Sequence, residues 1–184
     1  MDITQLVVLS KCCSQYEKMK EIIDKISSYN LFNYLFPGII FVILLREITE
    51  YDLIQENNFL GAFLYYFIGL VISRFGSLVI GKILQSKKLK FIEFADYKDF
   101  IFACDKDQKI ELFSEINNMY RTLISLFFLL LLSKLYQAIS DWLNISESLS
   151  YILLIIVLII LFVFSYRKQT GFVVKRVASR TENK

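Results

Sequence analysis

Histidine is absent from the 184-residue sequence, and proline occurs only once. The missing histidine removes the commonest general base and the commonest protein ligand for transition metals. The three cysteines, Cys12, Cys13 and Cys104, are not spaced as in a zinc site or a CxxC redox motif. We therefore expect reduced thiols facing a cytosol and no bound metal.

Catalytic groups are also scarce. No glycine-rich phosphate loop is present, and carboxylates occur only in the polar connecting segments. We assign no catalytic, cofactor-binding or metal-binding residue and expect a protein that is not an enzyme. The portions of the apolar segments expected inside the membrane contain neither aspartate nor glutamate, which also disfavours an ion-coupled transporter.

The chain is rich in apolar residues. It is 55% hydrophobic and 16% aromatic, with a mean hydropathy of +0.49. Four segments approach the roughly 20 apolar residues that a membrane-spanning helix needs: 31–45 with an extension to about 49, 58–84, 121–143 and 149–166. A soluble helical bundle is the alternative, but the almost purely aliphatic segment 151–164 disfavours it.

The predicted fold is an all-α integral membrane protein with four transmembrane helices. Helical spacing of apolar residues from Tyr16 to Ile26 predicts an amphipathic helix in a cytosolic N-terminal arm. The predicted divisions are the arm (1–30), helices one and two (31–85), a helical cytosolic cap (86–120), helices three and four (121–166), and a basic cytosolic tail (167–184). Pro37 is expected to kink the first span or to mark its beginning.

The basic residues predict the orientation. All of them except Arg46, Arg74 and Lys134 fall in the arm, in the stretch 82–121 or in the tail. With four spans, these three parts share one side of the membrane, and the positive-inside rule makes that side the cytosol. We expect a multi-pass protein of a bacterial inner membrane with both termini in the cytosol.

The predicted cap contains aromatic residues at three-residue spacing, interleaved with lysine and aspartate. Asp96 and Asp107 are expected to cap two helices, the second of which continues into the third span. The aromatics either cover the helical bundle or form a docking surface for a cytosolic partner. The candidate docking residues are Phe91, Phe94, Tyr97, Phe100 and Glu115.

The second span contains four small residues at intervals of four: Gly69, Ser73, Ser77 and Gly81. Such spacing lets helix backbones approach closely, so these residues are a predicted helix-packing seam, within one subunit or between subunits. We expect a homo-oligomer, for which a tetramer is one candidate state.

Two cations lie inside the predicted spans, Arg74 and Lys134. One interpretation is that both extend toward the headgroups and fix the depth of their helices. The alternative places Arg74 in the bundle interior, paired with Glu115 or with carbonyls near Asn117 and Asn118. Lipid headgroups are also expected to contact the tail, at Arg167, Lys168, Lys175 and Arg176.

Three stretches carry a family resemblance: NLFNYLFPG (30–38), GLVISRFGS (69–77) and EINNMYRTLIS (115–125). Together with span number, length and cap, the chain resembles the membrane subunits (KwaA-like) of the bacterial Kiwa anti-phage defence system. The resemblance implies a homo-oligomeric inner-membrane sensor that responds to phage infection. It also implies a cytosolic effector subunit, which the cap and tail would contact.

Three functions remain open from the sequence. The first is a non-enzymatic sensor and scaffold that recruits a cytosolic effector and needs no direct contact with nucleic acid. The second is a pore-forming effector that depolarises the membrane. The third is a small transporter, which the missing intramembrane acids and the absence of internal repeats disfavour.

Overall fold

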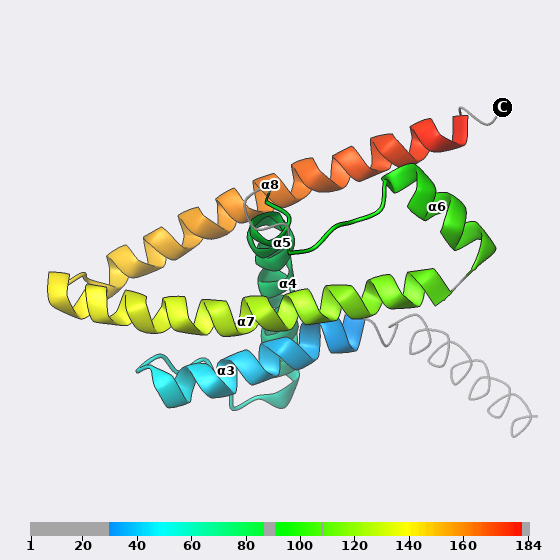
Figure 1. Ribbon diagram of the computed structural model, residues 1–184. Coiled ribbons are helices and arrows are strands. Elements are labelled where there is room, and N and C mark those ends of the chain that lie inside the picture. Colours follow the sequence, from blue (N-terminus) through cyan, green and yellow to red (C-terminus); the bar gives the residue numbers. More distant parts are fainter. Residues whose placement is uncertain (1–29, 87–90, 108, 182–184) are drawn as a thin grey trace, which may run out of the picture.

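A computed structural model describes residues 30–86, 91–107 and 109–181 (Figure 1). This part of the chain contains helices and no strand. The elements in chain order are η1 (Leu31–Leu35), α3 (Phe36–Ile48), α4 (Asn58–Phe75), η2 (Gly76–Ile80), α5 (Gly81–Leu84), α6 (Tyr97–Lys106), α7 (Lys109–Leu143) and α8 (Glu147–Thr181). The predicted amphipathic helix of the arm, with Cys12 and Cys13, lies outside the described residues.

In the described part of the chain, four helical segments are long and apolar enough to cross a membrane: Leu31–Ile48, Asn58–Leu84, Lys109–Leu143 and Glu147–Ser179. This confirms the prediction of an all-helical chain with four apolar helices, the architecture of a multi-pass membrane protein. Helix α7 begins at Lys109 and continues through the third span, as the sequence predicted, whereas α8 extends beyond the predicted fourth span, and each helix has 35 residues. At 1.5 Å per residue each is about 52 Å long, so each exceeds a hydrocarbon core of about 30 Å.

The buried core lies between α3, α4 and α7. Leu45 of α3, Ile72 of α4, and Leu126 and Leu130 of α7 form one buried cluster. Ile40, Phe41, Leu44, Ile68 and Leu129 pack around it. Apolar side-chain contacts therefore hold α3, α4 and α7 together as one unit.

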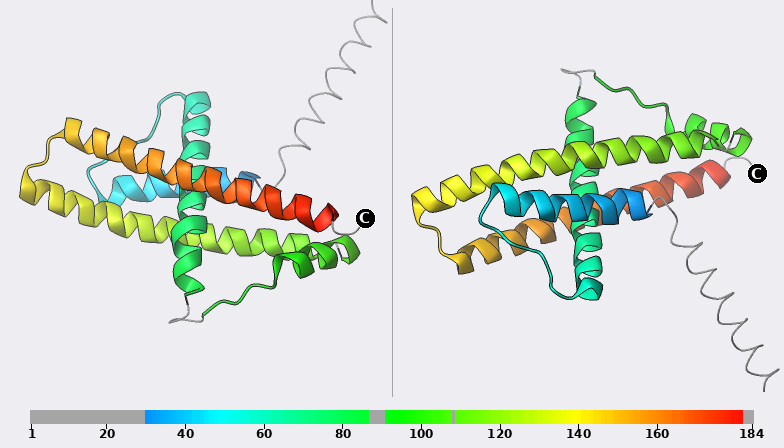
Figure 2. Two further views of the ribbon diagram at one scale, coloured as in Figure 1. Left: turned by 90° about the horizontal axis from the view of Figure 1, so that it is seen from above. Right: turned by 90° about the horizontal axis from the view of Figure 1, so that it is seen from below.

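Helix α4 runs across the other long helices. In both views of Figure 2, α3, α7 and α8 extend along one direction, and α4 with α5 crosses them steeply. A steep crossing brings two helices into contact over a short stretch rather than along their length. Few residues therefore make the contact at each crossing point.

Helix α8 lies outside this core. It is the most apolar of the four candidate spans, and none of its apolar window is buried. It touches α4 through a tilted ring pair of Phe67 and Phe162, with centroids 6.0 Å apart, and α6 through Tyr97 and Phe172, also 6.0 Å apart. Most of its apolar surface is therefore left for lipid or another protein to cover.

Different helices and turns lie at the two ends of the molecule. The cap end holds α6, the beginning of α7 and the end of α8, whereas the hairpin end holds the turn that joins α7 to α8 (Figure 1). Tyr51 of the loop 49–57 lies near Tyr136 and Asp141 of α7, and burial together with the charges of Tyr136, Asp141 and Glu50 raises the pKa of its phenol.

The predicted helix starts of the cap agree with the structure in part. Asp107 accepts a hydrogen bond from the Lys109 N–H at 2.9 Å and caps α7, which continues unbroken through the third span. Asp96 occupies the N-cap position of α6, but its side chain makes no capping hydrogen bond. Pro37 lies in the first turn of α3, directly after the π-helix η1, where its missing N–H is tolerated.

Candidate functional site

Three helices meet at a buried polar junction formed by Asn33, Ser73 and Thr122. Asn33 Nδ2 donates to Ser73 Oγ at 3.3 Å, which joins η1 to α4. Thr122 Oγ1 lies 2.9 Å from both Asn33 Oδ1 and Asn118 O, so the single hydroxyl hydrogen of this α7 residue is shared between two acceptors. Asn33 is 1% exposed and Thr122 is fully buried. In an apolar environment these bonds fix the relative position of the three helices.

Glycines allow the close approaches around this junction. A Cβ on Gly38 would collide with the carbonyl oxygen of Tyr65, and a Cβ on Gly69 would collide with that of Tyr34. These contacts join η1 and α3 to α4 backbone to backbone. At the crossing of η2 and α7, a Cβ on Gly76 would collide with Ser125 Oγ.

The four residues of the predicted seam lie against different neighbours. Gly69 and Ser73 face η1 and α3, whereas the Ser77 hydroxyl lies against α8. A Cβ on Gly81 would lie 3.6 Å from Arg121 Cδ of α7. The π-helix η2 begins at Gly76, between Ser73 and Ser77, and its wider turn rotates the residues that follow it. The contacts of these residues are within one chain.

Lys168 of α8 is bound to the π-helix η2. Its Nζ donates to Ser77 O at 2.8 Å and to Ser77 Oγ at 2.7 Å. Arg121, Lys82 and Arg74 are close enough to Lys168 for their charges to repel it. The structure thus gathers one cation each from α4, α5, α7 and α8 into a group that we call the basic cluster: Arg74, Lys82, Arg121 and Lys168.

The two predicted intramembrane cations have different surroundings. Arg74 is partly buried and belongs to the basic cluster. It makes no ion pair with Glu115, although both residues are in the described part of the chain. Lys134 is exposed, and its Nζ donates to Oε1 of the buried Gln137 at 3.3 Å.

The predicted docking residues separate into two groups. Phe91 and Phe94 are 76% and 57% exposed in the extended segment before α6. Tyr97 and Phe100 are partly buried, and Tyr97 packs on Phe172 of α8. Glu115 is also partly buried on α7. Some of these aromatics therefore pack against the molecule, and others face outward.

The sequence interpretation missed two exposed aromatic rings near the cap end. Phe102 of α6 is 63% exposed, with Lys106 Nζ 4.2 Å from its ring centroid, and Phe113 of α7 is 60% exposed. Together with Phe91 and Phe94 they are called the outward aromatics below. Three-residue spacing singled out only one face of α6, which is why Phe102 was not recognised.

Residues 167–181 of the predicted basic tail form the last part of α8. Arg167, Lys175 and Arg176 are exposed there, unlike Lys168, which turns toward Ser77. Over residues 30–86, 91–107 and 109–181, no group of three His, Cys, Asp or Glu side chains is arranged to hold a metal ion.

No family model, curated protein or solved structure matches this chain.

Proposed function

We propose that this chain is a non-enzymatic scaffold and sensor of a bacterial inner membrane, which forms homo-oligomers and holds a cytosolic effector protein at its cap end. The proposal joins two parts of the structure. The three helices that are joined by hydrogen bonds would serve as the membrane anchor. The polar cap carries exposed aromatic rings that do not pack against these helices.

The observation that carries the proposal is the outward aromatics. Phe91, Phe94 and Phe102 lie outside the candidate spans, in segments that also contain lysine, aspartate and glutamate, and Phe113 lies in the polar first part of α7. Exposed aromatics on a polar, folded element are typical of protein docking surfaces, where such rings supply much of the binding energy. The concentration of basic residues near the cap end supports a cytosolic position for this surface.

Two further features support the proposed homo-oligomer and the proposed role in phage defence. Helix α8 leaves an apolar surface that copies of the chain are able to share. The resemblance to Kiwa membrane subunits supports a role in phage defence, with infection sensed as a disturbance of the membrane, because the loop 49–57 and the turn 144–146 offer little surface for a specific receptor.

The test is a triple substitution of the outward aromatics. Phe91→Ser, Phe94→Ser and Phe102→Ser together should abolish phage protection in cells that carry the surrounding genes, while the level of the chain in membranes stays unchanged. The matched control replaces three exposed residues of the opposite loop, Tyr51, Leu53 and Ile54, with serine, and should keep protection. Full protection by the cap variant would refute the docking role.

A further inference from the structure

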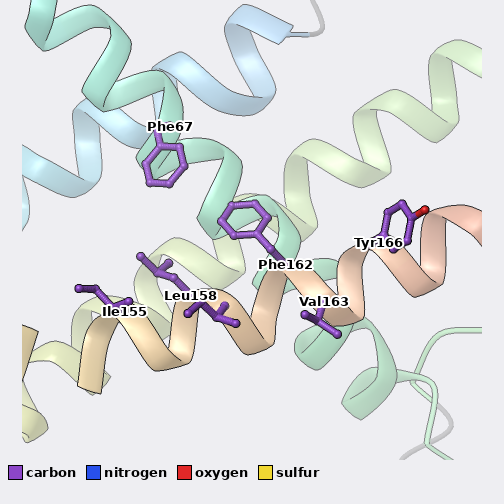
Figure 3. Close-up of a pocket in the computed structure, with 7 residues that line it drawn as sticks. Phe67, Ile155, Leu158, Phe162, Val163 and Tyr166 are labelled. Carbon is purple, nitrogen blue, oxygen red and sulfur yellow. The ribbon is translucent and has the colours of Figure 1, made fainter. Parts of the chain in front are cut away.

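Helix α8 contacts the other described helices at separate points. Near the hairpin end, the Tyr136 hydroxyl donates to Ser150 Oγ at 2.8 Å. At the crossing with α4, Phe67 faces Phe162 beside an open apolar groove of about 490 Å³, and the rest of the groove lining comes from α8 (Figure 3). Since none of the apolar window of α8 is buried, separate contacts rather than continuous packing hold this helix to the rest of the chain.

A third contact of α8 uses a charged hydrogen-bond donor. Lys168 Nζ donates to Ser77 O at 2.8 Å and to Ser77 Oγ at 2.7 Å. Both acceptors belong to the π-helix η2, in which the Gly81 N–H donates to Gly76 O, five residues back. Hydrogen bonds from an ionised donor are stronger than neutral ones. We therefore expect this contact to hold α8 more firmly than the ring pair or the hydroxyl pair.

Contacts continue from Lys168 to the cap. Lys168 Nζ lies 5.8 Å from the ring centroid of Phe172, which is four residues further along the same face of α8. The Phe172 ring packs on Tyr97, the first residue of α6, with centroids 6.0 Å apart. Consecutive side-chain contacts thus connect η2, α8 and α6, and α6 carries Phe102, one of the outward aromatics.

Lys168 lies at the edge of the apolar part of α8. Residues 151–164 include no charged side chain, whereas basic residues recur from Arg167 onward. A hydrogen bond is stronger in an apolar medium than in water, because water competes for the donor and the acceptor. The two bonds to Ser77 are therefore strong while lipid keeps water from this edge, and they weaken when water enters.

From these contacts we propose that the Lys168–Ser77 bonds are a release point that sets the position of the cap. In an intact bilayer the bonds hold α8 against η2, and Phe172 holds α6 through Tyr97. When a disturbed membrane admits water, the ammonium group is hydrated, and the end of α8 moves away from η2 together with α6. Only the consequence for partner binding rests on the proposed scaffold function, because Phe102 on α6 belongs to the docking surface.

Distances between spin labels test the movement in the full chain, reconstituted in vesicles of phosphatidylglycerol and phosphatidylcholine. The native cysteines are replaced by serine, and labels are attached to Asn117→Cys on α7 and Lys175→Cys on α8, which are exposed positions. Lys168→Met donates no hydrogen bond, so it should broaden the distribution of distances and shift it to longer values. Arg167→Met is the matched control, since Arg167 is exposed one residue away, and should leave the distribution unchanged.

Loosened lipid packing tests the trigger with the same labels. Lysophosphatidylcholine, which admits water to the bilayer, should shift the wild-type distances toward those of Lys168→Met. It should leave the distances in Lys168→Met unchanged, because the bonds that water weakens are already absent from that variant.

Amide hydrogen exchange tests the connection to the cap. Lys168→Met should speed exchange in α6 about ten-fold, the equilibrium effect of losing one hydrogen bond to a charged group. Phe172→Ala should act in the same direction, and the double variant should exchange no faster than the faster single variant, because both substitutions break one series of contacts. Exchange in α3 should stay unchanged, which shows that the three-helix unit remains folded.

Unchanged label distances in Lys168→Met, or equal changes in Arg167→Met, would overturn the release point. Unchanged exchange in α6, or additive effects of Lys168→Met and Phe172→Ala, would remove the connection to the cap. Wild-type distances that do not respond to lysophosphatidylcholine would overturn the trigger. Movement in a chain whose cap traps no soluble protein would support the release point and refute the scaffold function, whereas a trapped protein without movement would do the reverse.

Discussion

Asn33 is the side chain through which three helices are joined. Its amide donates to Ser73 and accepts from Thr122, across sequence separations of 40 and 89 residues. Such a bond within a membrane protein stabilises the fold modestly, but loss of one partner leaves buried polar atoms without compensation.

Replacing Asn33 by leucine should lower the free energy of unfolding by about 1–2 kcal/mol, because Ser73 and Thr122 each lose a partner. The measurement is reversible unfolding of the purified chain in detergent. Asn117→Leu is the control, since Asn117 is exposed on α7, and should change stability little. Equal effects of both substitutions would contradict the junction.

Two glycine substitutions should have opposite effects. Gly69→Ala places a methyl group against the carbonyl oxygen of Tyr34 and should destabilise the chain by about 2 kcal/mol or more, because two backbones must separate. Gly171→Ala meets nothing within 4 Å and should stabilise α8 by up to about 1 kcal/mol. Thermal unfolding of both variants checks the contrast, which would fail if Gly69→Ala were as stable as the wild type.

At the scale of elements, the four apolar helices could be predicted because each contains a long run of apolar residues. The cap of α7 by Asp107 followed from local spacing in the same way. The π-helix η2 could not be predicted, because Gly76 to Ile80 has the same composition as the helix around it. Its distinguishing contacts are with α7 and α8, which are distant in the sequence. The sequence analysis also missed the polar junction, because Asn33, Ser73 and Thr122 lie on separate helices and no local spacing relates them.

The helices should differ in their tolerance of large-to-small substitution. Leu126→Ala in α7 removes a fully buried side chain and should cost about 2–4 kcal/mol. Ile156→Ala in α8 removes a side chain that is 47% exposed and should cost less than about 1 kcal/mol. Unfolding is measured at a detergent ratio that keeps the chain monomeric. A large cost for Ile156→Ala under those conditions would show that α8 packs inside the subunit.

At the scale of the whole molecule, α6, the beginning of α7 and the end of α8 lie at one end (Figure 1). The steep crossing of α4 was not anticipated, because composition fixes the length of an apolar helix but not its direction (Figure 2). No single bilayer orientation aligns α4 and the other three helices with the membrane normal.

Cysteine labelling should define the orientation of the ends. In a chain whose native cysteines are replaced by serine, Lys106→Cys at the cap end should react with an impermeant maleimide only in inside-out vesicles. Ser148→Cys at the hairpin end should react only in right-side-out vesicles, and both positions are exposed. Labelling of both from the same side would contradict the proposed orientation.

The central claim is that the cap end holds a cytosolic protein. A photo-crosslinking amino acid placed at Phe102 of the full chain in living cells should trap one soluble protein, and deletion of the gene for that protein should abolish phage protection. The same amino acid at Tyr151, which is 63% exposed on α8 near the hairpin end, should not trap it. If Phe102 yields only crosslinks to lipid or to copies of the chain, the scaffold function is wrong.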